Sequence, residues 1–119
     1  PSPESMEMMG GKISAKQAAR RMNVPLVPGV DEAITDRAAA KHIAAEVGYP
    51  ILIKASAGGG GKGMRIVNSD AEFDEQLERA RSEALASFGD DAVFIEKYIT
   101  SPKHIEVQVL GDQHGNIVH

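Results

Sequence analysis

The chain has 119 residues, of which 42% are hydrophobic and 4% aromatic, so it can bury a mainly aliphatic core as one domain or part of one. Its formal net charge of −4 argues against a nucleic-acid binder held by bulk positive charge, and the absence of cysteine excludes disulfides and thiolate metal sites. The four histidines lack metal-ligand spacing, and no apolar run is long enough to span a membrane. We expect a cytoplasmic protein, and the sequence at both ends suggests a segment of a longer chain.

The N-terminal part of the chain is predicted to be helical. Ser2 can cap a helix whose first turn contains a proline, and Thr35 or Asp36 can cap another. The prolines within 25–29 restrict that stretch to a turn or to the edge of a sheet. Helices are therefore expected over 3–9, 12–22 and 36–47.

The second part of the chain is predicted to be mainly β-structure. One more helix is expected over 70–88, because Ser69 and Glu72 have the spacing of a capping box. Residues 111–116 have the composition of a hairpin turn. Strands are expected over 49–53, 64–67, 93–99, 104–110 and from 116 onward. This element order predicts an α+β fold, with a mainly antiparallel sheet and helices packed on one face.

A glycine-rich loop lies between the first two predicted strands. Five of the twelve glycines of the chain fall within 58–63. Lys54 precedes the loop, Lys62 lies within it and Arg65 follows it. Ordering so many glycines is entropically costly, which indicates a backbone that approaches a ligand closely. The flanking cations make that ligand an anion, and phosphate is the commonest one.

The known phosphate-binding loops differ from this one. A P-loop requires a serine or threonine after its lysine and a helix beyond, whereas Gly63 and a strand follow Lys62. A dinucleotide fingerprint also needs a helix to begin within the motif. A kinase glycine loop joins two strands, but its lysine comes after the loop. What remains is a strand–glycine–strand flap over nucleotide phosphates, or a flexible surface loop with incidental cations.

Three sequence strings, in this order, resemble the ATP-grasp segment of biotin carboxylase. They are KASAGGGGKGMR at 54–65, FIEKYI at 94–99 and PKHIEVQVL at 102–110. The resemblance extends over essentially the whole chain, including Lys12 in a Met-Gly-x-Lys string. It implies an N-terminal helical entry segment over 1–22 and an ATP-grasp lid subdomain over 23–119.

The resemblance implies that the whole protein uses ATP and bicarbonate to carboxylate biotin. Lys12 and Lys54 would then contact nucleotide phosphates, and amides of the glycine loop would cover them. Main-chain groups of Lys97 and Ile99 would bind the adenine edge, and His104 would lie near the sugar. The complete set of expected ATP-binding residues is Lys12, Lys54, Gly58, Gly59, Gly60, Gly61, Glu96, Lys97, Tyr98, Ile99 and His104.

The same resemblance places the remaining machinery outside this segment. No catalytic residue or Mg²⁺ ligand is expected here, so the segment alone is predicted to be inactive. Implied partners of the whole protein are the biotin carboxyl carrier and carboxyltransferase components. Gly11 departs from the family, which has aspartate before the lysine. The alternatives are the lid of another ATP-grasp ligase, such as carbamoyl-phosphate synthetase, and a non-enzymatic nucleotide-binding module.

Overall fold

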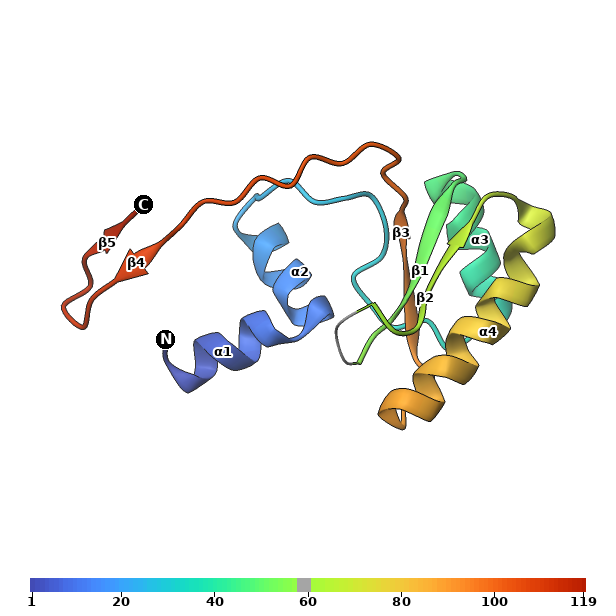
Figure 1. The fold of residues 1–119 in the computed structure, drawn as a ribbon, viewed down its shortest axis with the longest axis horizontal. Helices are drawn as coiled ribbons and strands as arrows, with labels where there is room; N and C mark the ends of the chain where they lie inside the picture. Colours follow the sequence, from blue (N-terminus) through green and yellow to red (C-terminus); the bar gives the residue numbers. More distant parts are fainter. Residues whose placement is uncertain (58–60) are drawn as a thin grey trace.

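The computed structural model describes residues 1–57 and 61–119 (Figure 1). No helix in these two ranges is both long and apolar enough to cross a membrane. The elements in chain order are α1 (Pro3–Gly10), α2 (Lys12–Arg21), α3 (Arg37–Val47), β1 (Ile51–Ala55), β2 (Met64–Val67), α4 (Asp70–Phe88), β3 (Val93–Lys97), β4 (Leu110–Gly111) and β5 (Ile117–Val118).

The main sheet has three antiparallel strands in the order β2-β1-β3. Lys54 in the central strand pairs with Met64 of β2 on one side and with Phe94 of β3 on the other. The strands β4 and β5 form a separate hairpin, closed by a hydrogen bond from the Asp112 amide to the Asn116 carbonyl. The predicted α+β class with an antiparallel sheet is confirmed.

One face of the main sheet carries the core. Helices α3 and α4 pack against this face, whereas α1 and α2 lie on the opposite side of the sheet (Figure 1). The expectation of helices on one face therefore holds for α3 and α4 only. The cluster of buried core residues consists of Ile34, Ala40, Ala44, Ile51, Ile53, Val67, Phe73, Leu77, Ala80, Val93 and Ile95.

Most of the predicted helix boundaries follow from local capping. The Ser2 hydroxyl accepts a hydrogen bond from the Ser5 amide, and the Asp36 carboxylate accepts one from the Ala39 amide at 2.7 Å. The capping box predicted for α4 is wrong in its contacts. Ser69 makes no side-chain cap, and the Glu72 carboxylate instead accepts the amide of Asn68 at 3.0 Å.

Residues 28–34 line the outer edge of β3. The Val30 amide donates to the Ile95 carbonyl at 3.0 Å, and the Lys97 amide donates to the Pro28 carbonyl at 2.7 Å. A side chain at Gly29 would have no room, since its Cβ would lie 2.4 Å from the Ile95 oxygen. The sheet-edge position predicted for 25–29 thus applies to its end, where Gly29 forms an antiparallel bridge with Glu96.

The strand predicted over 104–110 is wrong for most of its length. Only Leu110 belongs to a strand, and the apolar residues Ile105 and Val107 are 80% and 69% exposed. Alternation of polar and apolar residues predicts an extended chain, but a strand also requires a neighbour for its hydrogen bonds. No other part of the described chain pairs with 104–109, and the segment leads away from β3 toward the hairpin (Figure 1).

Candidate nucleotide-phosphate site

The candidate site lies on the face of the sheet opposite α3 and α4. Successive side chains of a strand point to opposite faces, and Ile51, Ile53 and Ala55 occupy the core face of β1. Lys54 therefore occupies the other face, where its partner across β3 is Phe94. Glu96, two residues after Phe94, lies on this same face. The sheet thus places a lysine and a glutamate from distant parts of the sequence side by side.

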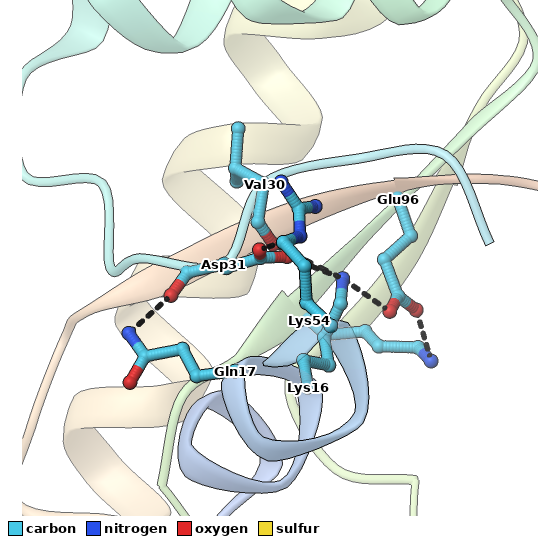
Figure 2. Close-up of polar contacts among 7 residues, drawn as sticks. Lys16, Gln17, Val30, Asp31, Lys54 and Glu96 are labelled. Carbon is cyan, nitrogen blue, oxygen red and sulfur yellow. Dashed lines mark hydrogen bonds and ion pairs between the residues drawn. The ribbon is translucent and has the colours of Figure 1, made fainter. Parts of the chain in front are cut away.

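Glu96 is shared by two lysines (Figure 2). Its Oε2 atom lies 2.6 Å from Nζ of Lys54, and its Oε1 atom lies 2.9 Å from Nζ of Lys16 on α2. The ring of Phe94 lies beneath both ammonium groups, with its centroid 5.4 Å from Lys16 and 5.9 Å from Lys54. The side chain of Glu96 is only 12% exposed. This carboxylate is therefore largely shielded from solvent, and both of its oxygen atoms are paired.

Lys12 adds a third ammonium group at the end of β1. Its Nζ donates to the carbonyl of Ala55 at 3.0 Å. Partial burial lowers the pKa of Lys12, and repulsion by Lys54 lowers it further, while Glu96 acts in the opposite direction. We call Lys12, Lys16, Lys54 and Glu96 the Glu96 cluster. The cluster has three ammonium groups and one carboxylate. A second carboxylate, that of Asp31, lies 3.9 Å from Lys16 but is paired more closely with Arg20, so the cluster keeps a surplus of positive charge suited to an anion.

The charge state of Glu96 follows from its contacts. Burial by itself would raise the pKa of this carboxyl group, but hydrogen bonds from Lys54 and Lys16 outweigh burial and lower the pKa below its ordinary value. Glu96 is therefore ionised at neutral pH. It can hold the two lysines in place without supplying a proton.

Apolar side chains surround Lys54 on the same face of the sheet. Leu52 precedes it by two residues, and Met64 and Ile66 of β2 lie opposite Lys54 and Leu52. Met64 and Ile66 are 37% and 42% exposed. A flat ring could lie on this surface while an attached phosphate reached the lysines. These residues were not among those predicted for the site, although period-two alternation along β1 and β2 would have placed them together.

The main-chain groups at the end of β3, from Lys97 onward, are candidates for binding a base. The amide of Lys97 is taken by Pro28, so its carbonyl points to the same edge, because both groups of a residue face one neighbour in an antiparallel ladder. The Lys97 side chain points elsewhere, since its Nζ donates to the carbonyls of Gly48 and Tyr49 at 2.8 Å each. Main-chain groups of Lys97 were expected to bind the adenine edge. Its amide already donates to Pro28, so the carbonyl is the group suited to that role.

The remaining predicted residues lie in different surroundings. The Tyr98 amide donates to the carbonyl of Pro50 at 3.1 Å, and the side chain of Ile99 is 45% exposed. His104 is 82% exposed and contacts Glu106 at 2.6 Å. In the described part of the chain it makes no contact with the Glu96 cluster. The structure therefore brings together Lys12, Lys54 and Glu96, but it does not add His104 to them.

The glycine loop is described only at its second half. The expected phosphate contacts of Gly58, Gly59 and Gly60 fall outside the described residues. Gly61 is exposed with φ of +84°, a backbone conformation that favours glycine. Gly63 has φ of +67°, and a Cβ there would lie 2.8 Å from Cβ of Ala55. The loop therefore returns to the sheet by close packing against the end of β1.

The comparison with protein families agrees with this geometry. Residues 11–119 match the family described as the carbamoyl-phosphate synthase L chain, ATP binding domain. The chain belongs to this ATP-binding domain family. The predicted antiparallel sheet with a strand–glycine–strand connection is thus part of a known ATP-binding fold.

Relatives of this ATP-binding domain are biotin-dependent carboxylases. The pyruvate carboxylase of Staphylococcus aureus is 51% identical over 119 residues, which are all of this chain and 10% of that protein. Chloroplastic biotin carboxylase 2 of Populus trichocarpa is 49% identical over 119 residues, which are 23% of its length. The chain therefore spans a tenth to a quarter of these relatives. The resemblance to biotin carboxylase drawn from the sequence is confirmed.

Two solved structures share the fold of this domain. A crystal structure of the biotin carboxylase–β-γ-ATP complex from Campylobacter jejuni matches with a TM-score of 0.92 and 49% identity, over 100% of this chain and 27% of that one. The biotin carboxylase domain of 2-oxoglutarate carboxylase from Hydrogenobacter thermophilus, in complex with MgADP, ADP and bicarbonate, matches with a TM-score of 0.89 and 49% identity, over 96% and 25%. ATP-grasp is therefore the fold of this chain.

The departure at Gly11 has a visible local consequence in this domain. Gly11 is the N-cap of α2 and has no side chain with which to cap it. The hydroxyl of Ser14 lies beside it and donates to the carbonyls of Gly11 and Met8 at 3.0 and 2.8 Å. Lys12 still reaches Ala55, so a capping aspartate is not required to place this lysine.

Lys16 is a further site residue that was not predicted from the sequence. It lies four residues after Lys12, so both project from one side of α2. That spacing was the available signal, but it is also typical of a solvated helix face. Within 1–57 and 61–119, no group of three or more histidine, aspartate or glutamate side chains could hold a metal ion.

Proposed function

We propose that this chain is the ATP-binding lid segment of a biotin carboxylase, whose whole protein uses ATP and bicarbonate to carboxylate biotin on a carrier protein. The observation that carries the proposal is the Glu96 cluster, with its surplus of positive charge on the face of the sheet opposite α3 and α4. The fold and family of the chain, and the ligands named for its relatives, support it.

The proposed orientation of ATP follows from the two ends of the site. Lys12 and Lys54 would hold phosphates, together with backbone amides of residues 58–61, because lysine ammonium groups and amides stabilise phosphate charge. The base would lie on the apolar surface that includes Met64, against the β3 edge where the Lys97 carbonyl and the Ile99 amide follow. We retain His104 as a residue near the sugar; this requires the segment 100–109 to approach the sheet.

The remaining parts of the proposal concern the whole protein. A divalent cation would be held by ligands outside this segment, and it would supply charge neutralisation during phosphoryl transfer. The carrier and carboxyltransferase components would be its partners, with neither nucleic acid nor membrane involved. We retain the division at residue 22 and a cytoplasmic location for this protein, although some relatives are named as mitochondrial or chloroplastic.

A chimeric enzyme tests the proposal. The matching segment of Campylobacter jejuni biotin carboxylase, 49% identical, is replaced by this chain. We expect bicarbonate-dependent ATP hydrolysis in the presence of free biotin. Lys54→Met should lower kcat/KM by roughly 10- to 150-fold, since losing a hydrogen bond to a charged group costs about 1.5–3 kcal/mol. The matched control is Lys41→Met, because Lys41 pairs with Asp70 and Asp74 on the other side of the sheet.

Two results would contradict the proposal. One is a folded chimera without this activity, and the other is a Lys54→Met chimera as active as the parent chimera. The isolated 119-residue chain should show no bicarbonate- and biotin-dependent turnover. Carbamoyl-phosphate formation by the chimera from bicarbonate, ATP and an ammonia source, without biotin carboxylation, would favour the alternative ligase.

A further inference from the structure

The side chain of Lys16 is largely shielded from solvent and hydrogen-bonded, which is uncommon for a lysine on a helix surface. Its side chain is 11% exposed. Its ammonium group donates to the Val30 carbonyl at 3.0 Å and to Oε1 of Glu96 at 2.9 Å (Figure 2). Asp31 lies farther away, at 3.9 Å, and is paired with Arg20 at 2.6 Å. Lys16 therefore has Glu96 as its close charged partner, and this contact ties α2 to β3.

Glu96 needs a second charged partner if Lys54 is to bind a phosphate, and Lys16 supplies it. The Oε2 atom of Glu96 pairs with Lys54 of β1, which is expected to bind phosphate. If Lys54 turned toward a phosphate, Glu96 would lose that partner while still largely buried. A buried carboxylate without a partner is strongly destabilising. With Lys16 still bonded to Oε1, however, the carboxylate keeps one charged partner throughout.

We propose that Lys16 is a positioning residue for Lys54, acting through Glu96. By neutralising the carboxylate on its inner side, Lys16 lets Lys54 exchange Glu96 for a nucleotide phosphate. This inference rests on the proposed ATP-binding function. It assigns Lys16 no contact with ATP and no part in the chemistry.

Removing the ammonium group of Lys16 should therefore weaken phosphate binding. In Lys16→Met, Oε1 of Glu96 loses its partner and Lys54 becomes the sole cation that pairs with the carboxylate. ATP then has to draw Lys54 away from an otherwise unpaired buried charge. Adenosine, which has no phosphate, does not compete for Lys54 and should bind as before.

The test is a calorimetric titration of the chimeric biotin carboxylase described above with ATP and, separately, with adenosine. For Lys16→Met we expect a Kd for ATP about tenfold higher, equivalent to about 1.4 kcal/mol, and an unchanged Kd for adenosine. Lys16→Arg keeps the charge and should retain most of the ATP affinity. Lys41→Met is the matched control, since it removes a paired helix lysine outside the site, and it should leave both affinities unchanged.

A double variant separates positioning from damage to the fold. In Glu96→Gln the side chain carries no charge, so Lys16 has no carboxylate to neutralise. Adding Lys16→Met to Glu96→Gln should therefore change the ATP Kd much less than the roughly tenfold change expected in the wild-type background. If Lys16→Met alone does not fold, a roughly tenfold loss of ATP affinity in the Glu96→Gln background would still refute the proposed role.

The outcomes distinguish this inference from the proposed function. If Lys54→Met weakens ATP binding but Lys16→Met does not, the role of Lys16 is refuted and the proposed function stands. Equal losses for ATP and adenosine in Lys16→Met, or a full loss in the Glu96→Gln background, would mean a structural role only. If Lys54→Met has no effect on ATP binding, or the parent chimera does not bind ATP, both proposals fail.

Discussion

The substitution Gly29→Ala should separate the edge segment from the sheet. Gly29 has φ of +154°, and its Cβ position lies 2.4 Å from the carbonyl oxygen of Ile95 and 2.8 Å from Cα of Glu96. These obstacles are backbone atoms, which cannot rotate aside as a flexible side chain can. An alanine there must therefore displace the segment from β3.

The expected loss of stability can be worked out from the contacts. Displacement breaks the hydrogen bonds from Val30 to Ile95 and from Lys97 to Pro28. Each is worth about 1 kcal/mol net, and the unfavourable backbone conformation adds about 1 kcal/mol. The free energy of unfolding should therefore fall by about 3 kcal/mol, which is a large share of the stability of a small domain.

Urea denaturation of the 119-residue chain, followed by circular dichroism, measures this change. The matched control is Gly89→Ala at the end of α4. Gly89 also has a positive φ, of +73°, but no heavy atom lies within 4 Å of its Cβ position. The control should lose only the conformational part, about 1 kcal/mol. If the two variants were destabilised equally, the close packing of Gly29 against β3 would be refuted.

Three further predictions concern the core, the charge of the site and a helix end. Phe73→Ala removes a fully buried ring and should lower the free energy of unfolding by about 3–5 kcal/mol, measured by urea denaturation. The pKa of Glu96 is lowered in the folded state. Its contribution to the free energy of unfolding is therefore present above the unfolded-state pKa and is lost as pH falls through the folded-state pKa. Glu96→Gln should lose less stability on acidification than the wild type, and parallel profiles of stability against pH would contradict this. Lys97→Met removes two hydrogen bonds to the carbonyls of Gly48 and Tyr49 and should lower the melting temperature, at a cost of about 1–3 kcal/mol.

Local sequence signals placed most helices correctly. Ser2 and Asp36 act as caps because a short polar side chain can reach an unpaired amide two or three residues ahead. The capping contacts of α4 were not predictable in the same way. Glu72 had two amides within reach, and it bonds Asn68 instead of Ser69.

The failure at 104–110 has a different cause. The alternating pattern correctly describes an extended chain, and His104 and Glu106 do lie on one side of it in mutual contact. Strand formation depends on a partner, and the pattern of one segment contains no information about whether a partner is present. For the same reason, the sequence pattern does not specify whether His104 lies next to the site.

The sequence by itself determined the helix limits and the two strands on either side of the glycine-rich loop, because those features depend on neighbouring residues. Lys12 was expected at the site only through the family resemblance. Only the tertiary structure decided that Lys54 and Lys16 meet the same carboxylate. Glu96 lies 80 residues from Lys16 in the sequence. Their contact results from the β1–β3 register and from the position of α2 beside the sheet. Ion pairing in this site therefore follows from which faces the fold brings together, and no local pattern specifies that.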